Sequence, residues 1–417
     1  DCDLCHDCLR DNHFATYNLG AATCLSGVEY GLLNGFAFSI VYVVLSTAAG
    51  QLADSVNRVR LLSGGVLLWS LACAAQALCK GFWSLLLVRL VLGIGESVGP
   101  ATSLSLLTAY FPTTHKRRGT ALAVYSAGLY IGIGAASLTV LLAKEVGWRS
   151  VAAGLGATGV VVAFLVFSLV DEPPRVTEAP PAAPADDDTR GLLPSPAGRL
   201  LPSSPRSSAS CCRRHVLRPL QSLLNNTTAV LIMLSAGFRG FGGIAIGTFL
   251  IKYVEAAHAS DVDRFSVAYA VIACVGGVLS TTLGGLASDK LAATSGDHTR
   301  GFMTAGMTVA AAAWFAGALL ASDFTGLVAF MALSYVFAEC WFPPLLALLQ
   351  LVVHPDSIGF ASGVFNFSVN LLGSGAPLLL GAIQDGLSDK RDIRWGLLVV
   401  VMSSYVLSSV LFVVVGC

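Results

Sequence analysis

Two ionisable residues lie seven positions apart within a long apolar stretch of the chain. Arg89 and Glu96 begin and end the segment RLVLGIGE. In an α-helix this spacing places both side chains on one face, two turns apart. A charge inside a membrane is costly unless it is paired or hydrated, and such residues mark substrate and proton pathways. The pattern predicts that both residues line a polar pathway in which Glu96 takes up and releases a proton. The alternative is a fixed structural ion pair.

Four further polar residues lie in other apolar runs, and each has two interpretations. Arg239 lies among glycines, and its guanidinium either anchors an anionic head group or packs against backbone carbonyls. Glu339 precedes two prolines, which kink a membrane helix, and is either a second proton site or a hydrogen-bond partner of a neighbouring helix. Asn366 and Asn370, four positions apart, either line the same pathway or form packing hydrogen bonds.

The elements that must position these side chains are membrane-spanning helices. Of the 417 residues, 55% are hydrophobic and only 12% are charged, whereas roughly a quarter are charged in an ordinary soluble domain. The mean hydropathy is +0.73. The 25 basic and 25 acidic residues cancel, so no overall field attracts a nucleic acid. The composition therefore excludes a soluble enzyme and a nucleic-acid binder.

Eleven apolar runs have the length of a spanning helix, which needs about 20 residues. They cover residues 31–53, 60–79, 83–110, 119–143, 150–170, 227–251, 264–287, 301–321, 325–353, 358–383 and 395–416. The runs predict an all-α membrane protein.

One long segment interrupts these runs. Residues 172–225 are rich in Pro, Ser, Asp and Arg, a composition that cannot bury enough apolar surface to become ordered. Five runs precede the segment and six follow it, so we expect a short or incomplete first helix near residues 11–25. The predicted organisation is an N-terminal helix bundle at 1–171, a disordered linker at 172–225 and a C-terminal bundle at 226–417.

The basic residues predict the side of the membrane on which the linker lies. Fourteen Lys and Arg residues fall on the linker side of this topology and eight on the other side. Because basic residues are enriched in cytoplasmic segments, we expect the linker to be cytoplasmic.

The two halves of the chain repeat one loop pattern. Gly50 and Asp54 stand four positions apart at the end of an apolar run, with Arg58 four positions later, and Gly285 and Asp289 repeat the first spacing in the second half. Two runs after each loop comes a membrane glutamate. Repetition of this kind is how many transporters are built.

Several segments resemble a known family of proteins. Residues 50–60 resemble the loop signature G-x-L-x-D-x-x-G-R of the major facilitator superfamily, with Asn57 in place of the second glycine. Residues 89–96 and 110–119 resemble the fourth helix and the following loop of its spinster-like branch, and Glu-Pro-Pro-Arg at 172–175 resembles that branch's exit from helix six.

The resemblance implies a fold and an activity. The fold is two six-helix bundles, the first helix being short, around a central cavity. The activity is transport by alternating access, of a lysolipid or sphingoid-like substrate, with H⁺ as an optional co-substrate. Membrane lipids are the expected partners, the expected state is a monomer, and no cofactor, metal or enzymatic activity is expected. A transporter of a small organic anion or sugar, and a transport-inactive sensor or receptor, are alternatives.

The resemblance also assigns roles to single residues. Asp11 stands near the position of an Asp-Arg pair in the first helix of that branch. Asp54 and Arg58 belong to a conformational gate, in which the loop Asp pairs with a loop Arg while the cytoplasmic side is closed. Gly50, Gly285 and Asp289 belong to the same gate. Such a contact exists in one of two states and therefore biases the equilibrium between them.

Overall fold

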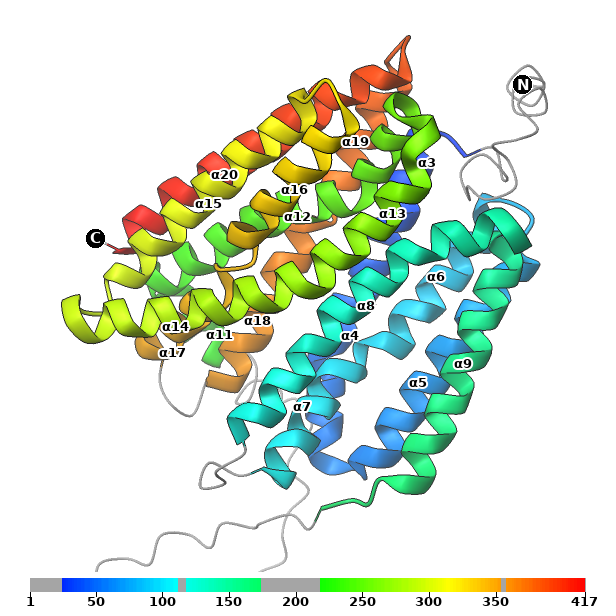
Figure 1. Ribbon diagram of the computed structural model, residues 1–417. Coiled ribbons are helices and arrows are strands. Elements are labelled where there is room, and N and C mark those ends of the chain that lie inside the picture. Colours follow the sequence, from blue (N-terminus) through cyan, green and yellow to red (C-terminus); the bar gives the residue numbers. More distant parts are fainter. Residues whose placement is uncertain (1–24, 112–117, 174–217, 354–357, 417) are drawn as a thin grey trace, which may run out of the picture.

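The computed structural model describes residues 25–111, 118–173, 218–353 and 358–416. These residues are almost entirely helical (Figure 1). Eleven helical segments within them are long and apolar enough to cross a membrane, which confirms the predicted spans and an integral, multi-pass membrane protein. The predicted start of a first helix, with Asp11, lies outside the described residues.

The N-terminal bundle contains five spans, two of which are built from two helices each. Its helices are α3 (Gly27–Asn34), α4 (Phe36–Ser55), α5 (Arg58–Ala75), α6 (Phe82–Ser97), α7 (Gly99–Tyr110), α8 (Arg118–Val146) and α9 (Trp148–Leu169). Helix α5 packs against α6 and α9.

The C-terminal bundle contains the other six spans. Its helices are α11 (Arg218–Leu224), α12 (Thr227–Ala257), α13 (Val262–Val271), α14 (Gly277–Ser295), α15 (Thr299–Leu320), α16 (Phe324–Ala338), α17 (Phe342–Val352), α18 (Ile358–Gly373), α19 (Gly375–Asp385) and α20 (Ile393–Gly416). A π-helical segment, Ile272–Gly276, joins α13 to α14. The short helix α11 lies within the predicted linker, whose residues 174–217 are outside the described part of the chain.

Polar residues at the predicted turns start several helices. Asn57, Asn226 and Asp323 precede α5, α12 and α16, and each side chain accepts a hydrogen bond from a first-turn backbone N–H. Such caps satisfy amide groups that have no partner inside the helix. Gly147 links α8 to α9 with a φ of 80°, a conformation that glycine adopts without strain.

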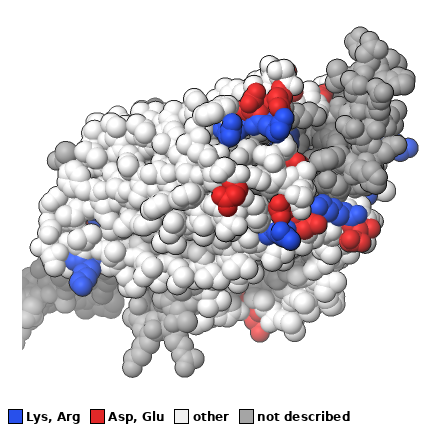
Figure 2. All heavy atoms as spheres, turned by 45° about the horizontal axis from the view of Figure 1, so that its top comes forward, with Lys and Arg blue, Asp and Glu red and all other residues white. Residues whose placement is uncertain are grey.

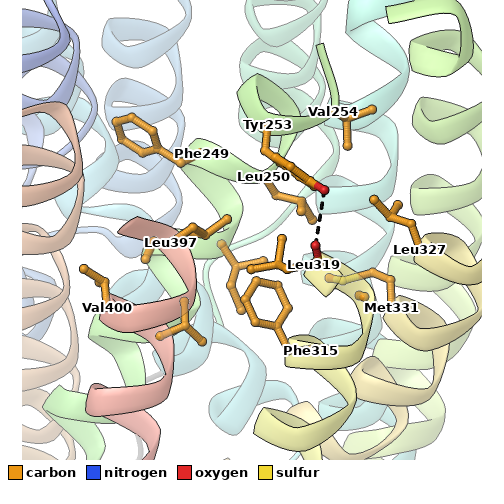
Figure 3. Close-up of a cluster of buried hydrophobic side chains, with 14 of the residues drawn as sticks. Phe249, Leu250, Tyr253, Val254, Phe315, Leu319, Leu327, Met331, Leu397 and Val400 are labelled. Atoms are coloured by element: carbon orange, nitrogen blue, oxygen red, sulfur yellow. Dashed lines mark hydrogen bonds between the residues drawn. The ribbon is translucent and has the colours of Figure 1, made fainter. Parts of the chain in front are cut away.

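The core of the C-terminal bundle surrounds α12 (Figure 3). Phe249 of α12, Phe315 of α15 and Leu397 of α20 are fully buried against one another's helices. The hydroxyl of Tyr253 donates a hydrogen bond to the Leu319 carbonyl at 3.3 Å. By contrast α9, at the edge of the other bundle, buries only glycine and alanine. The C-terminal half is therefore packed as one body around α12.

The molecular surface separates charged ends from apolar sides. In Figure 2 charged side chains gather near one end of the visible face, beside a broad area without them. The ion pairs Arg264–Asp261 and Arg391–Asp389 lie near the turns that join α12 to α13 and α19 to α20. Because charge is excluded from the lipid interior, this distribution fits helices embedded in a bilayer.

The two bundles are bonded to each other at the end of the molecule opposite the linker. Helix α3 packs on α19 and α8 packs on α13. Lys144 of α8 forms an ion pair with Asp263, and the Ser137 hydroxyl donates to the Ser266 carbonyl at 2.9 Å. In Figure 1 the bundles approach each other near α3 and α19 and lie apart near α7.

Candidate functional site

Each half of the chain carries a glutamate where a spanning segment is broken into two helices. Glu96 is the second-last residue of α6, and α7 begins with Gly99-Pro100. Glu339 lies between α16 and α17, whose first turn contains proline. Proline has no N–H and cannot continue the preceding helix. At the second break the Glu339 N–H donates a hydrogen bond to the Ser280 hydroxyl at 3.1 Å.

Arg89 and Glu96 lie on the same helix but are not directly bonded. Both side chains are half-buried, and they interact electrostatically. No ion pair within 4.0 Å joins them among the side chains that the structure describes. Arg89 is also within electrostatic reach of Tyr30 on α3 and Cys73 on α5. The fixed structural pair, the alternative raised from the sequence, is not formed in this conformation.

Arg239 lies at the centre of the C-terminal bundle and is 2% exposed. Its guanidinium donates hydrogen bonds to the Tyr405 hydroxyl at 2.6 Å and to the Ala338 carbonyl. It also lies 4.1 Å from the ring centroid of Tyr405 and 5.6 Å from that of Trp341. The Nε of Arg239 itself is buried and has no hydrogen-bond partner among the described atoms. These contacts are those of a packing residue, and a role as an anion anchor stays a prediction.

Glu339 takes part in a contact between the bundles. The hydroxyl of Tyr130, on α8, lies 3.4 Å from Glu339 Oε2, which is long for an O–H···O hydrogen bond. The backbone carbonyl of Tyr130 accepts a hydrogen bond from the Cys274 thiol of the π-helical segment Ile272–Gly276. Tyr130 thus contacts two elements of the opposite bundle near the middle of the molecule.

Asn366 and Asn370 share one face of α18, as predicted from their spacing. Their amide nitrogens donate to the carbonyls of Ser362 at 3.0 Å and of Asn366 at 2.9 Å. Asn366 is exposed. These hydrogen bonds run along α18 itself, so they do not tie α18 to a neighbouring helix.

The gate residues of the first half are described in part. Gly50 and Asp54 belong to α4, but their side-chain surroundings lie outside the described part. Arg58 Nε is 3.9 Å from Glu172 Oε1, and Glu172 Oε2 accepts the Val59 N–H at 3.1 Å. Arg58 is therefore held within its own bundle, at the start of the linker.

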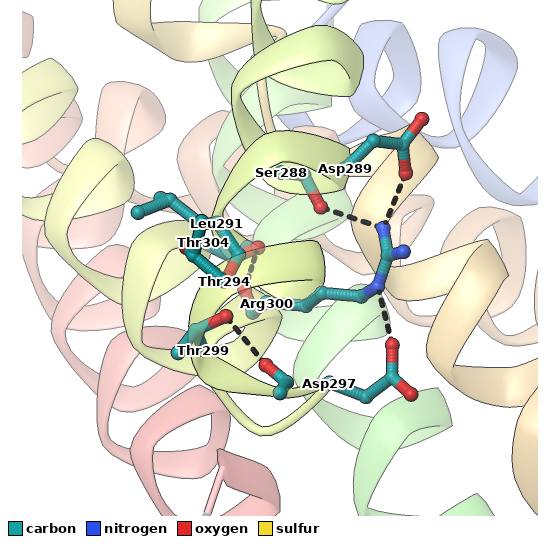
Figure 4. Close-up of polar contacts among 9 residues, drawn as sticks. Ser288, Asp289, Leu291, Thr294, Asp297, Thr299, Arg300 and Thr304 are labelled. Atoms are coloured by element: carbon teal, nitrogen blue, oxygen red, sulfur yellow. Dashed lines mark hydrogen bonds and ion pairs between the residues drawn. The ribbon is translucent and has the colours of Figure 1, made fainter.

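The gate residues of the second half form a similar arrangement (Figure 4). Arg300 donates to Asp289 at 2.8 Å, to the Ser288 hydroxyl at 2.9 Å and to Asp297 at 3.2 Å. Gly285 lies in α14, one turn before Asp289. As with Arg58, these contacts involve residues of one bundle only.

Sequence reasoning missed three residues at contacts between the bundles, two of them at the end opposite the linker. Asp385 accepts hydrogen bonds from the start of α3, and Lys252 Nζ lies 3.3 Å from the ring centroid of Tyr30. Tyr130, described above, is the third. Only Asp385 left a signal in the sequence, because it is an acidic residue at the end of an apolar run.

Ionisation at that end is perturbed in one exposed loop. The backbone N–H and the guanidinium of Arg391 hold the pKa of the Asp389 carboxyl below its ordinary value.

Within the described ranges, no three His, Cys, Asp or Glu side chains lie close enough together to hold a metal ion.

Comparisons with known proteins agree with the fold. The family model of the Major Facilitator Superfamily matches residues 12–377. An MFS-type efflux pump of Mycolicibacterium smegmatis is 26% identical over 368 residues, covering 88% of this chain and 78% of that protein. Protein spinster homolog 1 of Bos taurus is 32% identical over 169 residues, which cover 37% of this chain and 31% of that protein.

A solved structure extends the likeness to nearly the whole chain. The crystal structure of a bacterial homologue of the human lysosomal transporter spinster, in an inward-facing and unoccupied conformation, matches with a TM-score of 0.68. The match has 20% sequence identity and covers 98% of this chain and 90% of that one. At this identity the likeness concerns the fold.

Proposed function

The chain belongs to the major facilitator superfamily of membrane transporters, and from this premise we propose that it carries a lysolipid or sphingoid-like substrate by alternating access. The observation that carries the proposal is the distribution of contacts between the bundles. Hydrogen bonds and an ion pair join them toward the end opposite the linker. At the linker end, Arg300 forms an ion pair within its own bundle, and the nearest described carboxylate to Arg58, Glu172 at 3.9 Å, also belongs to its own bundle. An alternating-access cycle needs contacts that form at one end while the other end is open.

The substrate class is supported by the resemblance of residues 89–96 and 110–119 to the spinster-like branch and by the partial match to a spinster homologue. A lysolipid presents a phosphate that a guanidinium can bind through a bidentate fork. Arg89 is the better placed of the two membrane arginines, because no described carboxylate lies within ion-pair distance of it. The donors of Arg239, by contrast, are used by Tyr405 and Ala338.

Binding of ligands to the protein in lipid nanodiscs tests the substrate class. Lysophospholipids should raise the unfolding temperature, since a ligand at 100 times its Kd stabilises the native state by about 2.7 kcal/mol. Sugars and small organic anions should leave it unchanged, and Arg89→Gln should remove the response to the lysophospholipid. A response to a sugar or organic anion alone would overturn the proposed substrate class. Lysolipid binding without uptake by vesicles would instead identify a sensor.

We further propose that Asp54 acts as a latch on the linker side. Asp54→Asn should slow transport severalfold and leave substrate affinity unchanged, because the residue biases the two states without contacting the substrate. Uptake by reconstituted vesicles gives the rate, and binding to the same preparation gives the affinity. Asp289→Asn is the matched variant in the second half. Loss of binding by a folded Asp54→Asn protein would contradict the latch.

A further inference from the structure

Helices α3 and α19 approach each other at backbone contact, although they belong to different bundles. Gly27 and Gly31 lie one turn apart on one face of α3, and Gly35 follows at the end of the helix. A Cβ at Gly31 would lie 2.2 Å from the Pro377 carbonyl oxygen, and a Cβ at Gly27 would lie 2.5 Å from that of Gly381. Only glycine permits such an approach, as in other close helix pairs within membranes.

The contact extends down to the breaks in both spans. Gly35 separates α3 from α4, and Ser374 separates α18 from α19. A Cβ at Gly35 would lie 2.4 Å from the Ser374 carbonyl oxygen. The surface between the bundles here, called the α3–α19 seam, thus consists of two half-helices that end at facing breaks.

A carboxylate from the C-terminal bundle closes the outer end of the seam. Asp385 accepts the N–H of Gly27 at 2.6 Å and that of Val28 at 2.9 Å. These are the first two amides of α3, which have no partner within the helix. A charge-assisted hydrogen bond at a positive helix end is among the stronger polar contacts available to a protein.

Helix α3 has a second cap of its own. The Ser26 hydroxyl accepts the Glu29 N–H at 3.1 Å, and the Glu29 carboxylate accepts the Ser26 N–H at 3.0 Å. This capping box holds the first turn from within the helix. Asp385 is exposed, so water can replace it at the amides of Gly27 and Val28. The seam can therefore open without unfolding α3.

We propose that Asp385 is a positioning residue that holds the two bundles closed opposite the linker, and that the α3–α19 seam opens when the transporter exposes its site on that side. This inference rests on the proposed function. It adds a residue, Asp385, whose effect on transport comes from the balance between two states and not from contact with substrate.

Distances between spin labels at the seam end of each bundle test the proposal without any substrate. Labels on Leu78→Cys and Leu320→Cys, which are 82% and 54% exposed, report the separation in a background without native cysteines. Asp385→Asn should raise the ratio of separated to closed molecules about tenfold, because the neutral amide is a weaker acceptor than the carboxylate. The substrate affinity of the Asp385→Asn protein should equal that of the parent, while its maximal rate of transport should differ.

Asp389→Asn is the matched control, because Asp389 is bonded to Arg391 in the same loop and to neither bundle's seam. Gly31→Ala is a second, independent variant: its Cβ has no room at the seam, so it should also favour separated molecules. Gly64→Ala, with no atom within 4 Å of the new Cβ, should not. The inference is overturned if Asp385→Asn and Gly31→Ala both give the parent's distances. That result is independent of whether a lysolipid binds.

Discussion

Replacement of Glu96 by glutamine is expected to abolish transport driven by a pH gradient while leaving substrate exchange at equal pH on both sides. Glutamine keeps the shape of the side chain and fixes it in a neutral form. A coupled cycle requires a carboxyl that binds a proton on one side and releases it on the other. Glu96 is half-buried, at the break between α6 and α7, and no ion pair with Arg89 holds it in the charged form.

The measurement is uptake by reconstituted vesicles with and without an imposed pH gradient. Glu145→Gln is the matched control, because Glu145 is exposed near the end of α8 and should behave like the parent. Gradient-driven uptake by Glu96→Gln at the parent's rate would rule out the proton role. Failure of the variant to fold would instead indicate a structural role, because a buried charge that loses its compensation is strongly destabilising.

Removal of the Arg239 side chain is expected to cause the largest loss of stability in this protein. Arg239→Met leaves the Tyr405 hydroxyl and the Ala338 carbonyl without their donor and removes the interaction with two aromatic rings. An unsatisfied buried polar group costs about 1–3 kcal/mol, and a desolvated cation–π contact is worth about 2 kcal/mol. The free energy of unfolding should therefore fall by about 3 kcal/mol.

Reversible unfolding in mixed detergent micelles provides the measurement. Tyr405→Phe removes one acceptor and keeps the ring, so it should cost about 1 kcal/mol. Arg239→Lys keeps the charge but not the planar fork and should lie between these two variants. If Arg239→Lys kept full stability but lost binding of anionic substrates, Arg239 would be a substrate anchor and its packing role would be secondary.

The sequence alone determined the spanning segments. A span is a local property, because the bilayer thickness requires about 20 consecutive apolar residues whatever their neighbours are. The kink beside Glu339 was also predicted from the sequence, since proline acts on the helix in which it stands. The break beside Glu96, where α7 begins with Gly99-Pro100, was not predicted. The repeated loops at Asp54 and Asp289 indicated the family because a loop signature is also a local pattern of residues.

Only the tertiary structure decided which charged groups are paired. Arg239 bonds to Tyr405, 166 positions away, while Arg89 and Glu96, seven positions apart on one helix, are not bonded. Asp385 meets Gly27 at a separation of 358 residues. Helical spacing shows which side chains share a face, but a hydrogen bond also needs the partner helix, its tilt and its distance. A hydrogen bond between the two bundles also depends on the conformational state of the protein. That state is set by how the two separately packed bundles meet, which no local stretch of sequence shows.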